Sequence, residues 1–133
     1  MEDAFQMIAE QSRLFMPHGH CYLWIPSILW MHVISDALIG SAYMIISAVL
    51  LYLVRHLKLV ISPVLLAFGL FIFLCGLTHF MEIWTVWNPS YILAGFVKIA
   101  CATASVATAV ALMFKFPQIM RAVKALRDKN IFE

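Results

Sequence analysis

A cysteine and a histidine four residues apart, Cys75 and His79, are the residues in this sequence best suited to holding a metal ion. On a helix this spacing separates two side chains by about 40° around the axis and one turn along it, so both lie on one face. Cysteine sulfur is a soft ligand that selects Cu(I) or zinc, and a dry site with few ligands favours Cu(I) over four-coordinate zinc. The pair is therefore a candidate Cu(I) site, although the spacing alone is a weak signal. The alternative is a packed cysteine beside a histidine that only bonds another helix.

Ionisable residues inside apolar stretches are the next candidates, because they are costly in lipid and usually functional. Asp36, His79 and Lys98 each lie about 14–15 Å below the expected outer ends of their helices, at ~1.5 Å per residue. We expect Asp36 and Lys98 to neutralise one another, or either to bond His79. An ion pair that merely holds the helices together is the alternative. Glu82 lies nearer the outer surface, where we expect an indirect or interfacial role rather than ligation.

Composition indicates that lipid surrounds the elements carrying these residues. Of 133 residues, 64% are apolar and 12% charged, against about half and about a quarter in soluble domains. Three apolar stretches, 27–54, 60–87 and 91–114, each contain one full charge and exceed the ~20 residues that cross a bilayer as helix. The sequence therefore predicts an all-α membrane protein with three transmembrane helices at about 27–54, 62–87 and 91–115. No run of basic residues is long enough to form an arm that binds nucleic acid.

The distribution of basic residues predicts the orientation. Such residues follow the first and third stretches, whereas the connection at 88–90 has none. Basic residues prefer the cytoplasmic side, so the N-terminus is expected outside and the C-terminus in the cytoplasm. All four tryptophans then lie near the outer interface: Trp24, Trp30, Trp84 and Trp87.

The two ends of the chain are expected to differ from the membrane domain at 25–116. Residues 1–24 are predicted to be an extracytoplasmic segment, either loosely ordered or forming a surface helix through Phe5, Ile8, Ala9 and Ser12. Pro117 predicts a kink or restart. Residues 117–133 are predicted to begin a cytoplasmic signalling helix, with a coiled-coil spacing at Ile119, Val123, Leu126 and Asn130, or else a solvated basic tail.

Small residues predict close helix packing. They recur four apart on the third stretch, at Ala100, Ala104 and Thr108 and at Ala107 and Ala111, and the first stretch has Gly40 and Ser41. Such rows let helix backbones approach closely in lipid. We expect a tight bundle and a homodimer.

Several of these residues stand in recognisable motifs. The first stretch contains Ile34-Ser35-Asp36 followed by Ala42-Tyr43; the second contains Cys75-Gly76-Leu77-Thr78-His79 within the run 71–84; the third contains Val97-Lys98 before an Ala/Thr/Ser-rich run. Together, over about residues 18 to 116, they resemble the ethylene-binding domain of the ethylene-receptor family. The element His20-Cys21-Tyr22-Leu23-Trp24 is similar to the bacterial members.

The resemblance implies a non-enzymatic sensor. It implies that Cys75 and His79 hold Cu(I), which binds ethylene, and that Asp36 and Lys98 match functionally sensitive positions of the family. Positions linked to ligand binding correspond to Tyr43, Ile46, Ile72 and Ala109. It further implies a homodimer in a bilayer that signals to a cytoplasmic GAF or histidine-kinase module absent from this chain. A bacterial inner membrane is expected rather than plant endoplasmic reticulum.

Two departures from the family pattern and two alternative functions stay open. Only Cys21 lies near the region of the plant receptors' N-terminal cysteine pair, and Ile46-Ser47 replaces a common proline.

A haem-b anchor would use His32 and His79 as axial ligands, although their depths differ. A proton or ion pathway would use Asp36, Glu82 and Lys98, and would need oligomerisation to line a path.

Overall fold

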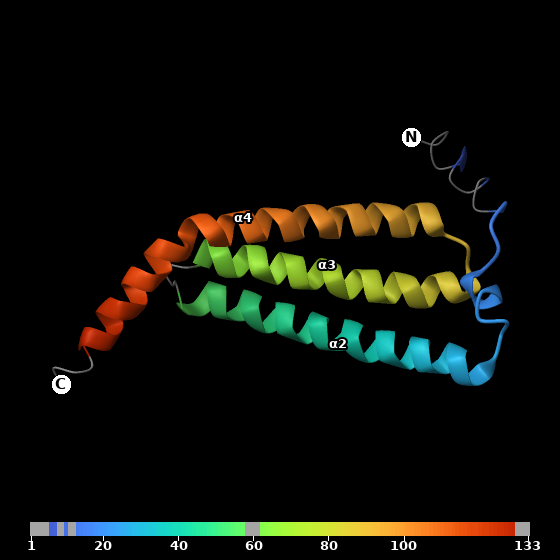
Figure 1. The fold of residues 1–133 in the computed structure, drawn as a ribbon, viewed down its shortest axis with the longest axis horizontal. Coiled ribbons are helices and arrows are strands. Elements are labelled where there is room, and N and C mark those ends of the chain that lie inside the picture. The colour runs from blue at the N-terminus through green and yellow to red at the C-terminus, as the bar shows by residue number, and fades with distance from the viewer. Residues whose placement is uncertain (1–5, 8–9, 11–12, 58–61, 130–133) are drawn as a thin grey trace.

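The computed structural model describes residues 6–7, 10, 13–57 and 62–129. Three long helices account for most of them: α2 spans Pro26–Leu57, α3 spans Ser62–Trp87 and α4 spans Tyr91–Lys129. A short 3-10 helix, η1, spans His18–His20 ahead of α2. Successive helices run antiparallel, with α3 between α2 and α4 (Figure 1). The predicted all-α architecture with three long helices is confirmed.

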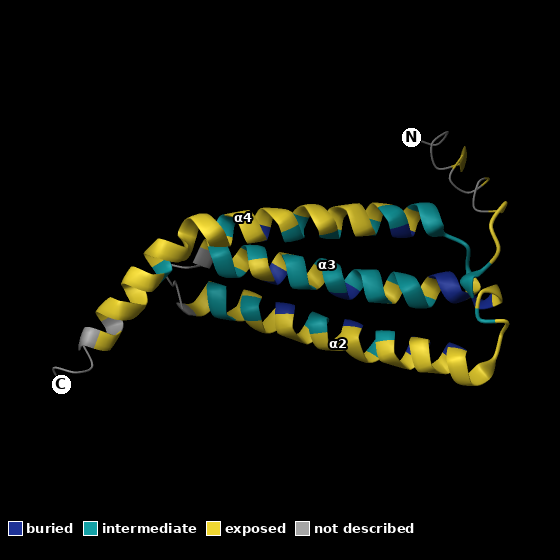
Figure 2. Cartoon of the chain, in the orientation of Figure 1, coloured by how far each residue is buried: buried dark blue, intermediate teal, exposed yellow. Residues whose placement is uncertain are grey.

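Each helix is long and apolar enough to cross a membrane, and the bundle exposes most of its large apolar side chains. The candidate spans are Pro26–His56, Pro63–Trp87 and Tyr91–Ala125. Figure 2 shows that the outward surfaces of the helices are largely exposed. Lipid tails are as apolar as these side chains, so exposure to a bilayer carries no penalty. The chain is a multi-pass membrane protein.

The end of the bundle that is expected to be the outer one, at the right of Figure 1, brings together η1 and the connection between α3 and α4. Trp30 of α2 and Trp87 of α3 lie here with ring centroids 6.5 Å apart. The Tyr91 hydroxyl donates a hydrogen bond to the Met16 carbonyl at 2.7 Å, which ties the segment before η1 to α4. This end is therefore closed by aromatic and hydrogen-bonded contacts.

The helix α4 continues through Pro117, where the sequence predicts a kink or restart and a boundary after residue 116. A proline removes one helical hydrogen bond and bends the helix without having to end it. Figure 1 shows α4 bending away from the bundle in its C-terminal part. Residues 117–129 are thus a continuation of the third membrane helix. The coiled-coil pattern extends to Asn130, outside the described residues, as do the predicted surface-helix positions Phe5, Ile8, Ala9 and Ser12.

The backbones of α2 and α3 come close together at Gly40 and Gly76. A Cβ atom on Gly76 would lie 3.3 Å from the Gly40 carbonyl oxygen, and one on Gly40 would lie 3.4 Å from the Gly76 oxygen. A side chain at either glycine would require its neighbours to shift: at Gly76 the Gly40 oxygen and Tyr43 Cβ, and at Gly40 the Phe80 ring, which would lie 3.2 Å away. The small residue Gly40, predicted to allow close packing, therefore lies at the crossing of α2 and α3.

On α4 the predicted rows of small residues are only partly turned inward. Thr108 is buried, whereas Ala100 and Ala107 are exposed. The half-buried side chains nearest to Thr108 on the same face are those of Cys101, Ala104, Ser105 and Ala111. The rotation of α4 about its axis selects this face, and four-residue spacing alone does not specify that rotation.

Candidate metal centre

His79 lies in the C-terminal half of α3 and is hydrogen-bonded to Asp36 of α2. The distance from His79 Nδ1 to Asp36 Oδ1 is 2.8 Å, and the two side chains are 27% and 23% exposed. A carboxylate only accepts hydrogen bonds, so Nδ1 carries the hydrogen and donates it. Of the pairings that the common depth of Asp36, His79 and Lys98 allowed, the structure therefore shows the one between Asp36 and His79. Nε2, the other ring nitrogen, stays available as a metal ligand.

Tyr43, one of the expected ligand-binding positions, also contacts the imidazole. Its ring lies edge-on to the His79 ring, with centroids 5.8 Å apart and planes at 70°. Asp36, Gly40 and Tyr43 all lie on the face of α2 that packs against α3. The close approach at Gly40 is what lets a short aspartate side chain reach across to His79.

Cys75 stands one turn before His79 and lies against α4. Its Sγ atom is 3.4 Å from Sγ of Cys101, and both thiols are free and half-buried. Sequence reasoning missed Cys101. Counting depth along the helices would have identified it. At ~1.5 Å per residue from Pro89, Cys75 and Cys101 lie about 21 and 18 Å below the expected outer boundary, which is nearly the same level.

Lys98 and Glu82 form a separate ion pair between α4 and α3. The Lys98 Nζ atom lies 2.6 Å from Glu82 Oε1, and the side chains are 60% and 39% exposed. A lysine near the end of a membrane helix extends its long side chain toward the interface. Lys98 is therefore directed to the shallower carboxylate, and Asp36 is left to His79.

The remaining expected ligand-binding residues differ in position. Ile72 is half-buried, whereas Ile46 is 44% exposed and Ala109 is also exposed. The structure therefore directs Ile46 and Ala109 away from the packed faces of the three helices. Their expected role stays a prediction.

His32, the alternative haem ligand, lies at the outer end of α2. Its ring stacks in parallel on that of Tyr22, with centroids 4.9 Å apart and planes at 7°. Burial raises the pKa of the Tyr22 phenol, and the negative charges of Glu82 and Asp36 add to the increase. Tyr22 therefore stays a neutral ring against which His32 packs.

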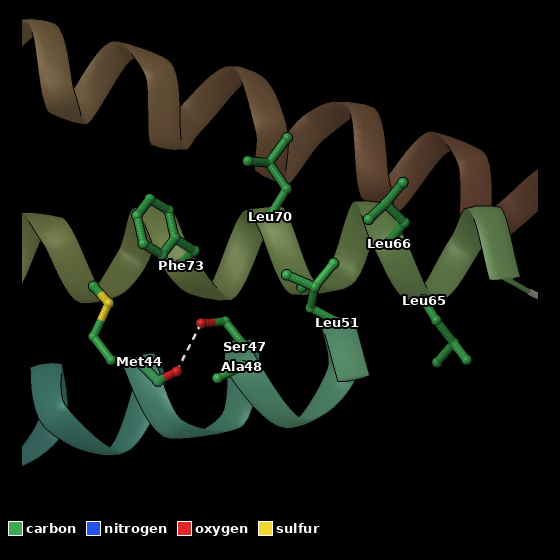
Figure 3. A pocket seen from close by; sticks show the side chains of 9 residues that line it. Met44, Ser47, Ala48, Leu51, Leu65, Leu66, Leu70 and Phe73 are labelled. Carbon is green, nitrogen blue, oxygen red and sulfur yellow. Dashed lines mark hydrogen bonds between the residues drawn. The ribbon is translucent and has the colours of Figure 1, made fainter. Parts of the chain in front are cut away.

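An apolar cavity of about 360 Å³ lies between α2 and α3 on the other side of the Gly40–Gly76 crossing (Figure 3). The lining residues are Met44, Ser47, Ala48, Leu51, Leu65, Leu66, Gly69, Leu70 and Phe73. The Ser47 hydroxyl donates to the Met44 carbonyl at 2.9 Å, as Figure 3 shows, so this polar lining group is already satisfied. A Cβ on Gly76 would lie 2.7 Å from the Met44 methyl. The cavity thus begins beside the residue that follows Cys75.

Across the described ranges 6–7, 10, 13–57 and 62–129, no three His, Cys, Asp or Glu side chains gather into a preformed metal cluster. The soft donors are instead arranged as a thiol pair on the α4 side of α3 and a carboxylate-bound imidazole on its α2 side. Both pairs lie within the candidate membrane spans.

These features define a membrane domain of three helices with sulfur and imidazole donors inside its bundle. A family model described as the N-terminal domain of ethylene receptor 1-like proteins matches residues 27–122, and the chain belongs to this family. It is the family whose motifs the sequence resembles.

Plant proteins are among the relatives of this chain. The chain is 39% identical over 106 residues to ethylene receptor 3 of Oryza sativa subsp. japonica, a match that covers 74% of this chain and 13% of that protein. It is 39% identical over 99 residues to ethylene receptor 2 of the same subspecies, covering 71% of this chain and 13% of the relative. It is 34% identical over 106 residues to ethylene receptor 2 of Arabidopsis thaliana, a match that covers 77% of this chain and 14% of that protein. No solved structure matches the chain.

Proposed function

We propose that this chain is an ethylene-sensing domain in which Cys75 and His79 hold a Cu(I) ion inside the membrane. Cu(I) would accept an alkene's π electrons into an empty valence orbital and donate electrons from its filled d shell into the alkene's π* orbital, which would give a small apolar gas a specific attachment point. The relatives are named ethylene receptors, and the match spans only a small part of their length. The ligand and the signalling role are therefore proposals for this chain.

The observation that carries the proposal is the hydrogen bond from His79 to Asp36, 2.8 Å long and one helical turn from Cys75. Histidines that bind metal usually donate their second ring N–H to a carboxylate or carbonyl, which fixes the tautomer and the ring orientation. Here that donor is Nδ1, so Nε2 is the ligand atom. Asp36 is thus a positioning residue for the imidazole.

The donor set suits copper. A thiolate with a neutral imidazole is a soft combination, and soft ligands select Cu(I) among the common metals. Neither Cys75 nor His79 lies at the exposed outer or inner end of α3. Both residues lie within a candidate membrane span, where lipid would exclude water and protect the reduced ion.

The apolar cavity between α2 and α3 gives a small apolar ligand a place to reside near the site. It begins at Met44, next to Gly76. Transfer of an apolar molecule from water to an apolar space is favourable. The cavity therefore raises the local concentration of gas beside the metal ligands.

The proposed context is a homodimer with its N-terminus outside and its C-terminus in the cytoplasm. Basic residues at the two expected cytoplasmic ends support the orientation. The continuous α4 would carry a change in helix packing toward a cytoplasmic GAF or histidine-kinase module. The element at residues 20–24 favours a bacterial inner membrane.

The test is copper and ethylene binding by purified protein. We would load the chain with Cu(I) in detergent under reducing conditions and measure retained copper and bound labelled ethylene for the wild type and Cys75→Ser. Cys21→Ser is the matched control, because Cys21 is an exposed thiol outside the candidate spans. We expect the wild type and Cys21→Ser to bind both, and Cys75→Ser to lose both while staying helical.

Three other results would each contradict a different part of this proposal. Copper retained by Cys75→Ser would remove that residue from the site. Copper held without ethylene would contradict the proposed ligand, and a wild type that holds no copper would contradict the whole proposal.

A further inference from the structure

The thiols of Cys75 and Cys101 lie within hydrogen-bonding distance of each other across the interface between α3 and α4. Their sulfur atoms are 3.4 Å apart, and both residues are half-buried. Two facing thiols differ from an isolated buried cysteine, which is usually a small packing residue. Their placement therefore calls for a role of its own.

Independent contacts hold the two helices in this register. The Thr108 hydroxyl of α4 donates to the Ala67 carbonyl of α3 at 3.2 Å, two turns from the thiol pair. At the outer side, Lys98 pairs with Glu82. The facing of Cys75 and Cys101 is thus a consequence of how α3 and α4 pack along their length.

The neighbouring polar side chains have partners of their own. The Ser105 hydroxyl donates to the Cys101 carbonyl at 2.6 Å, and the Thr78 hydroxyl donates to the Cys75 carbonyl at 2.7 Å. Each bond lies within its own helix and satisfies a hydroxyl in an apolar environment. Because neither hydroxyl is hydrogen-bonded to a sulfur atom, the thiols of Cys75 and Cys101 contact each other instead.

We propose that Cys101 is a further ligand of the Cu(I) ion, so that the thiolates of Cys75 and Cys101 hold it from α3 and α4. The His79 imidazole, which lies on the α2 side of α3, would join this site by turning toward the thiol pair. This inference rests on the proposed copper site and extends it to a second helix. Metal–sulfur bonds are about 2.3 Å long, so two sulfurs on one ion lie at most about 4.6 Å apart. The separation of 3.4 Å is within that reach.

The binding step is balanced without a redox partner. Each thiol loses its proton to solvent as its sulfur binds the metal, and copper enters and stays as Cu(I). Two thiolates are the soft donors that Cu(I) prefers. The second thiolate would strengthen retention of the ion.

A ligand on α4 would also connect the metal to the helix that continues toward the C-terminus. The helix α4 runs unbroken from Tyr91 to Lys129 and leaves the bundle at its far end (Figure 1). A gas molecule that alters the coordination of the copper would then act directly on α4 through Cys101. A site held by α3 alone would reach α4 only through packing.

The experiment counts sulfur ligands and cysteine protection in the full chain. X-ray absorption spectroscopy of the Cu(I)-loaded wild type should show two sulfur neighbours for each copper, and Cys101→Ser should show one. Competition with a chromogenic Cu(I) chelator should show that Cys101→Ser binds copper at least about 100-fold more weakly, since loss of an outer-shell partner alone costs 10–100-fold. Cys101→Met, which keeps a soft sulfur, should recover part of this loss.

Alkylation followed by mass spectrometry gives a second readout on unmodified protein. Cu(I) should protect both Cys75 and Cys101, while the exposed Cys21 reacts at the same rate with and without copper. Ser105→Ala, one turn further along the same face of α4, is the control for packing. It should keep both the sulfur count and the affinity.

The results that overturn this inference differ from those that overturn the copper site. If the wild type shows one sulfur neighbour, if Cys101→Ser keeps the wild-type sulfur count and affinity, or if Cu(I) protects Cys75 while Cys101 still reacts, Cys101 is no ligand although copper binding stands. If the wild type retains no Cu(I), both proposals fail.

Discussion

The two helix interfaces of this domain are built differently. Between α2 and α3 the backbones meet at Gly40 and Gly76, and the polar contact is the bond from His79 to Asp36. Between α3 and α4 the contacts come from side chains: a hydroxyl, a thiol pair and an exposed ion pair. Backbone contact at glycines leaves little freedom for the two helices to shift, whereas side-chain contacts can rearrange.

This difference suggests a division of roles. The interface of α2 with α3 fixes the imidazole, because Asp36 and Tyr43 are both presented by a helix pressed against α3. The interface of α3 with α4 brings the second sulfur and adjoins the helix that extends out of the bundle. We therefore expect substitutions at the first interface to affect copper affinity and assembly, and those at the outer ion pair to have little effect.

The largest effect beyond the metal ligands themselves is expected for Asp36→Ala. It removes the acceptor for His79 Nδ1 and with it the fixed orientation of the ring. Copper affinity should fall about 10–100-fold, the usual cost of losing such a partner. Chelator competition measures this change, and Asp36→Asn, which keeps an acceptor oxygen, should lose less. Equal affinities in the wild type and Asp36→Ala would show that the bond is only structural.

An intermediate effect is expected for Gly76→Ala. The new Cβ atom would lie 2.7 Å from the flexible Met44 methyl and 3.3 Å from both the Gly40 carbonyl and Tyr43 Cβ. The methyl can move, but the backbone oxygen cannot without displacing α2. We expect a destabilisation of about 1–3 kcal/mol, as in other overpacked interiors, and weaker copper binding.

Gly95→Ala is the matched control for this substitution, because a Cβ on Gly95 meets nothing within 4 Å. Removing a helical glycine in open space should stabilise the protein by about 0.5–1 kcal/mol. Thermal or denaturant unfolding in detergent measures both variants. If Gly76→Ala is as stable as Gly95→Ala, the contact between α2 and α3 is looser than the structure indicates.

The smallest effect is expected for Lys98→Ala. Its partner is Glu82, and the two side chains are 60% and 39% exposed. Exposed ion pairs contribute up to about 1 kcal/mol, so stability should change by less than that. We expect the variant to keep its copper and to lose less ethylene binding than Asp36→Ala. A Lys98→Ala protein that loses copper would place this lysine in the metal site.

Much of the fold follows from local properties of the chain. Span length and apolar content predicted three helices, because about 20 apolar residues are needed to cross a bilayer whatever they pack against. A common depth put Asp36 within reach of His79. Four-residue spacing predicted Cys75 and His79 on one face of the helix, but in the structure Cys75 contacts α4 and His79 contacts α2. These inferences need only the rise and period of a helix.

The pairings themselves depend on how each helix is rotated and on its register with its neighbours. Depth allowed Asp36 to meet either Lys98 or His79, and packing at Gly40 and Gly76 selected His79. The rotation of α4 turned Cys101 and Thr108 toward α3 and Ala109 outward. Such choices arise because side-chain packing between helices, rather than any property of one helix, decides which of several equally deep residues come into contact.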